Sequence, residues 1–371
     1  MKKVCWISNA PAPYKVALMQ LLGKQVELTC LFECRGEKDR EKSWYDYRFS
    51  GFQAIFLSET DARAVIRHQA AECDCLINSD YTKPICMYAV RQFHRAHKPT
   101  ILHADGGLAV PRGMMDQVIS LVMKKNDYFM SSGSETDQYF RYYGIPKDHI
   151  FHYRFACMPA AQLEENRSMR EHYERCRSQC GYQEAVIFLS VGQQIPRKGY
   201  DLLAKALEGT DPSKIGVYVI GGLPEDDVSC ILQGKRISNM HFLPFMESRK
   251  LSAYYAGADV FVLPTRYDIW GLVINEAMSF GLPILSTTTC VAARQFSSLF
   301  QNAVLYDAEN IAALHENLLK LAAEQEFRRH LGNRSATGIR EYSLESMCAD
   351  FVQTLQEVME RYHQPHEISD I

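Results

Sequence analysis

The chain has 371 residues, of which 47% are hydrophobic and 23% are charged. This length exceeds that of one ordinary domain, and the composition excludes bulk disorder. No apolar run approaches the roughly 20 residues that a membrane-spanning helix needs. The net charge of −3 argues against a protein that binds nucleic acid.

The start of the chain and its cysteines predict a cytoplasmic protein. Only four apolar residues precede Ser8 after the two lysines, which is too few for a signal peptide, so this segment is interpreted as a first strand. The twelve cysteines include no C-x-x-C pair. We therefore expect reduced thiols, and we predict no metal site and no cofactor.

Charge is shared unevenly along the chain. Residues 1–180 carry 25 Lys and Arg against 21 Asp and Glu, whereas residues 181–371 carry 16 against 23. A mildly basic first half suits anionic lipid headgroups or a phosphate-bearing acceptor. Ordinary variation of surface charge explains the difference equally well.

Short apolar runs alternate with amphipathic helical stretches in the first half of the chain. The pattern predicts strands at Val4–Ser8, Val26–Phe32, Asp74–Asn78, Thr100–His103 and Tyr128–Ser131. It predicts helices at Tyr14–Gly23, Ala62–Ala71, Pro84–His97, Met114–Lys125 and Glu135–Tyr143. Fully apolar strands that alternate with helices are typical of a parallel sheet covered on both faces.

The alternation lapses between Cys157 and Gly181, where Gln162–Ser178 is interpreted as an exposed helix in a linker. It then restarts, with strands predicted at Ala185–Val191, Ile215–Ile220, Met240–Leu243, Val260–Leu263, Pro283–Ser286 and Ala303–Tyr306. Helices are predicted near Gly199–Leu207, Ser248–Ala256, Gly271–Phe280 and Asn310–Glu324, and helical pattern then dominates to Tyr362. We predict an α/β fold with two doubly wound parallel-sheet domains facing across a cleft, with ligands at the carboxyl ends of the strands.

The richest motif is a polar loop that follows the buried strand Val260–Leu263 and leads into a helix near Gly271. Backbone N–H groups at such a loop and helix start form an anion site suited to a diphosphate. Asp268 lies in this loop, and Glu276 lies within the apolar helix, where a carboxylate is costly without partners. Ribose hydroxyls are suitable partners. An equally good alternative is a purely structural one, in which Asp268 is an ordinary acid at a helix start and Glu276 bonds to a neighbouring loop.

A second motif follows the strand that ends near Gly192. Adjacent cations, Arg197 and Lys198, precede the helix that starts at Gly199, so Lys198 is placed to reach a phosphate from the carboxyl end of the strand. The alternative is a solvated basic loop. Gly221-Gly222, after another strand, is a weak phosphate-loop signal.

A third motif ends a strand of the first half. His103 and Asp105 are followed by Gly106-Gly107, which allow close approach of a ligand. The alternative for His103 is a satisfied histidine of the core.

The segment from about Ser190 to Pro283, which contains the first two motifs, resembles the family-4 glycosyltransferases of GT-B fold. Their signature is an acidic residue, seven residues, then Glu, followed by Ala-Met and a Gly-Leu-Pro turn. Here Asp268 and Glu276 bracket seven residues, although the first acid is usually Glu. Gln193 stands where a phosphate-binding Arg is common, which leaves Lys198, helped by Arg197, to neutralise the diphosphate.

The first half is more loosely similar to the acceptor domain of bacterial surface polysaccharide glycosyltransferases, both capsular and exopolysaccharide. The resemblance implies an acceptor-binding domain at residues 1–157, to which a helix at 344–371 returns, and a donor-binding domain at residues 158–343. It implies metal-independent, retaining transfer of a hexosyl group from a UDP- or GDP-sugar to a glycan or lipid-linked glycan in surface polysaccharide biosynthesis.

The resemblance also implies catalytic roles for His103, Lys198 and Asp268. The implied donor-binding residues are Gly192, Gln193, Arg197, Lys198, Gly221, Phe245, Met246, Asp268, Ile269, Trp270, Gly271, Leu272 and Glu276.

Two other functions remain open. One is a catalytically inactive partner that binds sugar nucleotides, which the missing Arg at Gln193 favours, and the other is a sugar-nucleotide epimerase. For the location we expect a cytoplasmic enzyme with weak peripheral contact at the inner face of the cell membrane. Aromatic and basic residues at Tyr139–Tyr143 and His149–Arg154 form the predicted contact surface.

Overall fold

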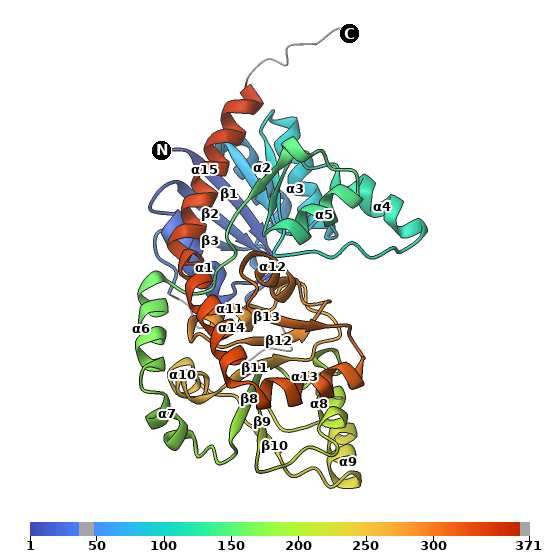
Figure 1. The fold of residues 1–371 in the computed structure, drawn as a ribbon. Coiled ribbons are helices and arrows are strands. Elements are labelled where there is room, and N and C mark those ends of the chain that lie inside the picture. The colour runs from blue at the N-terminus through green and yellow to red at the C-terminus, as the bar shows by residue number, and fades with distance from the viewer. Residues whose placement is uncertain (37–47, 364–371) are drawn as a thin grey trace. The chain divides into compact units, whose positions relative to one another are not determined.

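The structure is a computed structural model, which describes residues 1–36 and 48–363. The chain divides into two compact units, each with its own sheet (Figure 1). Unit 1 comprises residues 1–156 together with the final helix, and unit 2 comprises Cys157–Ser343. Of the predicted returning segment 344–371, residues 364–371 lie outside the described residues.

Unit 1 contains a seven-stranded parallel sheet in the order β3-β2-β1-β4-β5-β6-β7. The strands are β1 (Lys3–Ser8), β2 (Glu27–Phe32), β3 (Gln53–Phe56), β4 (Cys75–Asn78), β5 (Thr100–His103), β6 (Tyr128–Ser131) and β7 (Ile150–His152). The five predicted strands are confirmed to within one residue at each end. The sequence pattern missed β3 and β7, which are the two edge strands.

Successive side chains of a strand point to opposite faces of the sheet, so both faces of this sheet carry buried side chains. Helices cover both faces. They are α1 (Pro13–Leu22), α2 (Ala62–Glu72), α3 (Pro84–Arg95), α4 (Met114–Met123), α5 (Ser134–Tyr142) and α15 (Leu344–His363). Cys5 and Ile7 of β1 share one buried cluster with residues of α2 and α3. Trp6, between them, stacks on Phe351 of α15 with ring centroids 5.2 Å apart.

Helix α15 is also tied to unit 1 by charge. The Asp350 carboxylate accepts hydrogen bonds from the backbone N–H, Nε and Nη2 of Arg154, at 2.8, 2.9 and 2.6 Å. The last described helix of the chain is therefore an integral part of the first unit.

The segments predicted to touch a membrane are mostly not available for that contact. Tyr139, Phe140 and Tyr143 are buried in the cluster between α5 and the sheet, because their spacing places them on one side of the helix. Arg154 is bonded to Asp350. Of the tyrosines at 139, 142 and 143, only Tyr142 is exposed, so the predicted contact surface at Tyr139–Tyr143 is wrong for most of its aromatic residues.

Unit 2 contains a six-stranded parallel sheet in the order β10-β9-β8-β11-β12-β13. The strands are β8 (Val186–Val191), β9 (Ile215–Ile220), β10 (Met240–Leu243), β11 (Val260–Leu263), β12 (Ile284–Thr287) and β13 (Ala303–Tyr306). All six were predicted, again to within one residue. The parallel α/β architecture expected from the alternation is thereby confirmed for both units.

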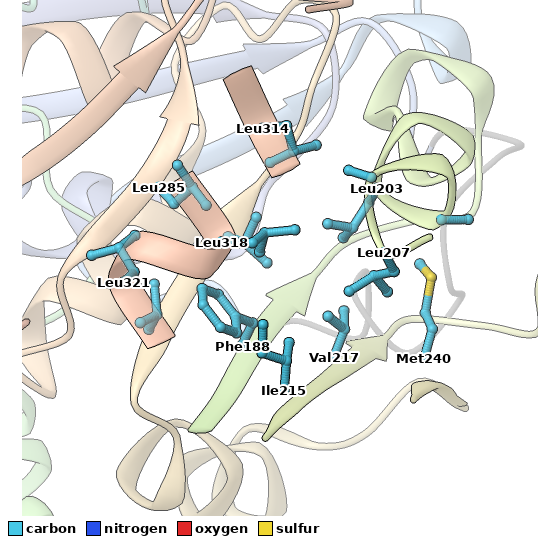
Figure 2. Packing of buried hydrophobic residues seen from close by; sticks show 14 of the residues in the cluster. Phe188, Leu203, Leu207, Ile215, Val217, Met240, Leu285, Leu314, Leu318 and Leu321 are labelled. Atoms are coloured by element: carbon cyan, nitrogen blue, oxygen red, sulfur yellow. The ribbon is translucent and has the colours of Figure 1, made fainter. Parts of the chain in front are cut away.

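Nine α-helices accompany the sheet within the described residues of unit 2. They are α6 (Ala160–Arg170), α7 (Tyr173–Cys180), α8 (Tyr200–Ala206), α9 (Asp226–Gly234), α10 (Ser248–Gly257), α11 (Leu272–Ser279), α12 (Val291–Phe300), α13 (Ile311–Ala323) and α14 (Gln325–Gly338). Figure 2 shows the core on one face of the sheet, where Leu203 of α8 and Leu318 of α13 pack over Phe188 of β8 and Val217 of β9.

The expectation of an exposed linker helix at Gln162–Ser178 is correct for a helical and mostly exposed segment, but wrong for a linker, because the segment packs within unit 2. Two helices, α6 and α7, occupy this segment and contact α10, with Leu163 and Cys176 buried. Arg170 donates through one nitrogen to the carbonyl oxygens of Ala256 and Ala258, both at 2.6 Å, at the end of α10. The charged composition misleads because long arginine side chains can pack along the surface while their guanidinium groups cap a neighbouring helix.

Candidate functional site

The predicted donor-binding residues of unit 2 come together at one edge of its sheet. They follow β8, β9, β10 and β11, and the carboxyl ends of parallel strands share one edge. Strands β9 and β10 lie on one side of β8, whereas β11, β12 and β13 lie on the other. The strand order therefore reverses between β8 and β11, which is the position where open α/β sheets bind ligands.

The loops after β8 and β11 are joined to each other at this reversal. The backbone N–H of Arg266 donates to the Arg197 carbonyl oxygen at 2.8 Å, and the Thr265 hydroxyl donates to the same oxygen at 3.0 Å. Gly199 has a φ of +72°, and a Cβ there would lie 2.1 Å from the Pro264 carbonyl oxygen. Only glycine permits this close approach of the two loops.

An ion pair lies where the two loops meet. The Lys198 Nζ is 2.6 Å from Asp268 Oδ2, and both residues are buried. The Arg197 guanidinium is 3.5 Å from Asp268 Oδ1 and donates to the Tyr267 carbonyl oxygen at 2.7 Å. The alternative of a solvated basic loop is wrong for Lys198, which is 8% exposed, whereas Arg197 does reach solvent.

Asp268 is held by its own backbone. Its N–H donates to the Thr289 carbonyl oxygen, and its carbonyl oxygen accepts from Val291, so the loop runs beside the start of α12. This pairing fixes the position of the carboxylate at the edge of the sheet.

The residues between Asp268 and α11 differ in what they can offer a ligand. Ile269 is half exposed. The Trp270 side chain is buried and its indole N–H donates to Asn275 Oδ1 at 2.9 Å, so this side chain is not available to a ligand. Gly271 has a φ of +99° and precedes Leu272, the first residue of α11. This arrangement keeps backbone N–H groups at the start of a helix, as an anion site requires.

The loops after β9 and β10 complete the edge. The N–H groups of Gly221 and Gly222 both donate to the Leu243 carbonyl oxygen. A Cβ at Gly221 would lie 2.1 Å from the carbonyl oxygen of Gly192, and φ at Gly221 is +140°. Phe245 is half exposed, whereas the Met246 side chain is buried. Phe245 is therefore the residue of this pair that can stack on a base.

Glu276 lies on the apolar helix α11 and is half-buried. Its Oε2 accepts a hydrogen bond of 2.8 Å from the Tyr255 hydroxyl of α10. Burial raises the pKa of Glu276, and the hydrogen bond from Tyr255 lowers it only in part. The Glu276 carboxylate thus has a partner within the protein, as the alternative of a Glu bonded to a neighbouring loop predicted. That partner, however, comes from helix α10 and not from a loop.

Sequence reasoning missed two polar groups beside the predicted residues. The side-chain amide of Gln194, next to the exposed Gln193, has its nitrogen and oxygen buried, and neither has a hydrogen-bond partner within the described residues. Arg266 forms a paired contact with the Asp201 carboxylate at 2.8 Å through each of two nitrogens. The polar residues that follow the buried strand β8 could have indicated Gln194 as a candidate site residue. The pair of Arg266 and Asp201 joins residues 65 apart in the sequence, so no local pattern could have indicated it.

His103 ends β5 in unit 1, apart in sequence from the residues above. It is 2% exposed, and within the described residues neither ring nitrogen has a hydrogen-bond partner, so it is not the satisfied core histidine of the alternative. Burial lowers the pKa of His103 to about 4, which keeps the imidazole neutral at neutral pH. Its Nε2 lies 3.7 Å from Asp105 Oδ1.

Two residues of α1 complete the polar group around Asp105. The Tyr14 hydroxyl donates to Asp105 Oδ2 at 2.7 Å, and Lys15 Nζ lies 3.5 Å from the same oxygen. Burial alone would raise the pKa of Asp105, but the nearby Lys15, His103 and Tyr14 outweigh it and lower that pKa. His103 and Asp105 therefore lie in a built polar cluster of unit 1.

A search of residues 1–36 and 48–363 finds no group of three or more His, Cys, Asp and Glu side chains placed to hold a metal ion. In the same part of the chain, no helix is both long and apolar enough to cross a bilayer.

Comparison with known proteins finds sequence similarity in the second unit. Residues 178–337 match the family described as glycosyl transferases group 1. The 41.2 kDa protein of the cps region of Klebsiella pneumoniae is 28% identical over 116 residues, which cover 31% of each chain. The lipopolysaccharide glucosyltransferase WaaG of Escherichia coli is 26% identical over 177 residues, 45% of this chain and 46% of WaaG. The chain thus spans about a third to a half of the length of these relatives.

Solved structures extend the likeness over nearly the whole chain. HepE of Anabaena, solved in complex with UDP, has a TM-score of 0.77 and 11% identity, and the match covers 96% of this chain and 100% of HepE. WaaG has a TM-score of 0.66 and 16% identity, with 95% and 99% covered. Residues 178–337 thus resemble the group 1 glycosyl transferases, and the chain has the GT-B fold that its sequence predicted.

Proposed function

We propose that the protein is a retaining glycosyltransferase that transfers a hexosyl group from a UDP- or GDP-sugar. Its acceptor is a glycan or lipid-linked glycan in bacterial surface polysaccharide biosynthesis. The named relatives from a cps region and from lipopolysaccharide synthesis support this substrate class, and the UDP in the HepE structure supports a nucleotide-sugar donor. We further propose that the enzyme acts in the cytoplasm.

The observation that carries the proposal is the pairing of Lys198 and Arg197 with Asp268 at the strand reversal. The Asp268 carboxylate contacts both cations, but its single negative charge can offset only one of the two positive charges. A bound diphosphate would compete for these cations and release Asp268 to accept hydrogen bonds from sugar hydroxyls. Charge that develops on the leaving diphosphate would then meet these two cations, and the burial of Lys198 would strengthen its electrostatic stabilisation.

The bond changes are simple. The bond between the anomeric carbon and the phosphate oxygen breaks, and its electron pair stays on the phosphate. The acceptor oxygen bonds to the same face of the sugar, and its proton passes to the leaving phosphate. We assign no carboxylate as a covalent nucleophile, unlike in retaining hydrolases. Because Lys198, Arg197 and the N–H groups at the start of α11 supply positive charge, we propose that no metal is required.

Further roles are proposed for other residues of each unit. Glu276 accepts hydrogen bonds from the ribose, and Phe245 contacts the base. The backbone of Gly221 and of Gly271 approaches the phosphates closely, since neither residue has a side chain. His103 contacts the transferred sugar as a neutral imidazole, which its low pKa supports.

A screen of UDP-, GDP-, ADP- and dTDP-sugars tests the proposal. We expect one donor class to raise the melting temperature and to be slowly hydrolysed without an acceptor, with release of the nucleoside diphosphate. Binding without any turnover, with or without lipid-linked acceptors, would instead favour an inactive binding partner. Conversion of the sugar without its release from the nucleotide would favour an epimerase.

A further inference from the structure

Helix α4 of unit 1 has two apolar faces, and only one of them is packed. Ile119 and Met123 are buried against the unit. The other apolar side chains are exposed, which is unusual for so many large residues on one short helix. Their exposed fractions are 87% for Met114, 56% for Met115, 53% for Val118 and 70% for Leu121. We call these four residues the α4 apolar face.

Helical spacing brings these residues onto one side of α4. Met114, Val118 and Leu121 follow the i, i+4, i+7 pattern, and Met115 lies three residues before Val118. In a surface helix of a globular protein, the stripe with this spacing normally faces the core. Here it faces away from the core, so the composition of the helix suits a second apolar environment outside the unit.

The helix is held rigidly in this orientation. The Asp116 carboxylate accepts from the hydroxyls of Tyr142 and Tyr143, at 2.9 and 3.1 Å, and from the backbone N–H of Arg112. The Ser120 hydroxyl donates to the Tyr143 carbonyl oxygen at 2.8 Å. Figure 1 shows α4 beside α5 at the outer edge of unit 1. Since these bonds fix the opposite side of the helix, the α4 apolar face is presented and cannot turn inward without breaking them.

Val110, which precedes the helix, is a further exposed apolar residue, with an exposed fraction of 49%.

Basic residues flank the α4 apolar face. Arg112 precedes the helix, Lys124 and Lys125 follow it, and all three are exposed. The single acid within the helix, Asp116, is already bonded to three donors. An apolar face with a cationic border is complementary to a bilayer with anionic headgroups. A second copy of the chain suits this face less well, because a symmetric contact would bring the same basic residues together.

We propose that the α4 apolar face inserts shallowly into an anionic lipid bilayer, with Arg112, Lys124 and Lys125 at the headgroups. This membrane contact rests on the proposed function, because a lipid-linked acceptor lies in such a bilayer. The binding of the helix to lipid does not itself depend on catalysis. Each basic residue contributes only a small part of the attraction to an anionic surface, so binding is reversible and salt-dependent.

Flotation of the full chain with vesicles tests this inference. We expect binding to vesicles of phosphatidylglycerol and phosphatidylethanolamine at low salt, and little binding to pure phosphatidylcholine. The double variant V118S/L121S should lose at least tenfold in affinity, since it removes two exposed apolar side chains and no packed ones. A matched control, L299S/L319S, removes two exposed leucines of unit 2 and should bind as the wild type does.

Two further readouts separate the alternatives. Val118→Trp should give a blue-shifted emission on anionic vesicles, whereas Leu319→Trp should not. Failure of the wild type to float with anionic vesicles, or equal binding by V118S/L121S, would overturn the inference. A molecular mass that rises with concentration in the wild type and not in V118S/L121S would also overturn it, in favour of a second copy. Donor hydrolysis in solution should be the same in the wild type and in V118S/L121S, because the α4 apolar face takes no part in it. If neither protein hydrolyses any donor, that result would count against the proposed function and not against the membrane contact.

Discussion

Lys198 and Asp268 hold opposite charges 2.6 Å apart in a part of unit 2 that is almost closed to water. A buried pair of this kind couples stability to function, because removal of either partner leaves the other charge without its main contact. A loss of activity on mutation of Lys198 therefore has two sources, the missing cation and the weakened fold. The experiment must separate them.

Lys198→Ala should reduce donor turnover by roughly two orders of magnitude, as loss of a group that stabilises transition-state charge does. It should also destabilise the fold by roughly 3 kcal/mol, near the lower end for a broken buried pair, since Arg197 remains 3.5 Å from Asp268. The double variant K198M/D268N should recover most of that stability and none of the turnover. Urea denaturation and donor-turnover assays measure both effects, and near-normal turnover by folded Lys198→Ala would discard the role.

Glu276 offers a prediction with a definite pH dependence. Its raised pKa means that the folded protein binds this proton more tightly than the unfolded chain does. The stability that results is complete below the ordinary glutamate pKa of about 4.3 and is lost as pH rises through the folded pKa. Glu276→Gln should therefore melt at a higher temperature than wild type at neutral pH and at the same temperature near pH 4. Thermal melts across this range check the sign.

The same variant tests the ribose role. Glu276→Gln should weaken donor binding by about 1–3 kcal/mol, because an amide replaces a charged acceptor. Calorimetry with the donor nucleotide measures the change. A variant that is more stable at neutral pH but binds the nucleotide as well as wild type would place Glu276 outside the donor site.

At the scale of elements, the sequence pattern predicted eleven of the thirteen described strands, missed two edge strands and misjudged one charged helical segment. β5, β6 and β9 were predicted with their observed bounds, because apolar runs between polar turns have few other interpretations. The edge strands β3 and β7 have four and three residues and carry little pattern. The helices α6 and α7 were misjudged, because their stability comes partly from arginine contacts to α10 that no local pattern contains.

Gly221 tests whether the edge of the unit 2 sheet needs its close backbone approach. Gly221→Ala should destabilise the protein by about 1–3 kcal/mol, since φ is +140° and the new Cβ would meet the Gly192 carbonyl oxygen at 2.1 Å. The matched control is Gly234→Ala in α9, where nothing lies within 4 Å and the helix should gain up to about 1 kcal/mol. Denaturant unfolding compares the two. Equal stability of both variants would mean that the loop after β9 adapts freely.

At the scale of the molecule, the sequence could predict where the candidate site lies but not how its residues pair. Parallel strands bring their carboxyl ends to one edge, so the loops after β8 and β11 were expected to meet. The contact between Lys198 and Asp268 joins residues 70 apart and depends on β8 lying beside β11, which no local signal shows. The burial of Trp270 was hidden for the same reason.

Surface properties were the least predictable part of the molecule. The first half carries a small basic excess, but most of the aromatic residues expected to face a membrane lie in the core. The apolar residues of α4 could be read as core from their spacing alone. Which side of a doubly apolar helix is packed depends on its neighbours, here the hydrogen bonds of Asp116 and Ser120 to residues at the end of α5.

The most direct test of the proposed glycosyl transfer is to follow the reaction of an α-linked nucleotide sugar by proton NMR. The donor is the one identified in the screen, supplied with a lipid-linked acceptor. Retaining transfer predicts release of the nucleoside diphosphate with a first-formed product whose anomeric signal is α. A β product would contradict retention, and an unchanged donor spectrum with every nucleotide sugar and acceptor tried would contradict the glycosyltransferase itself.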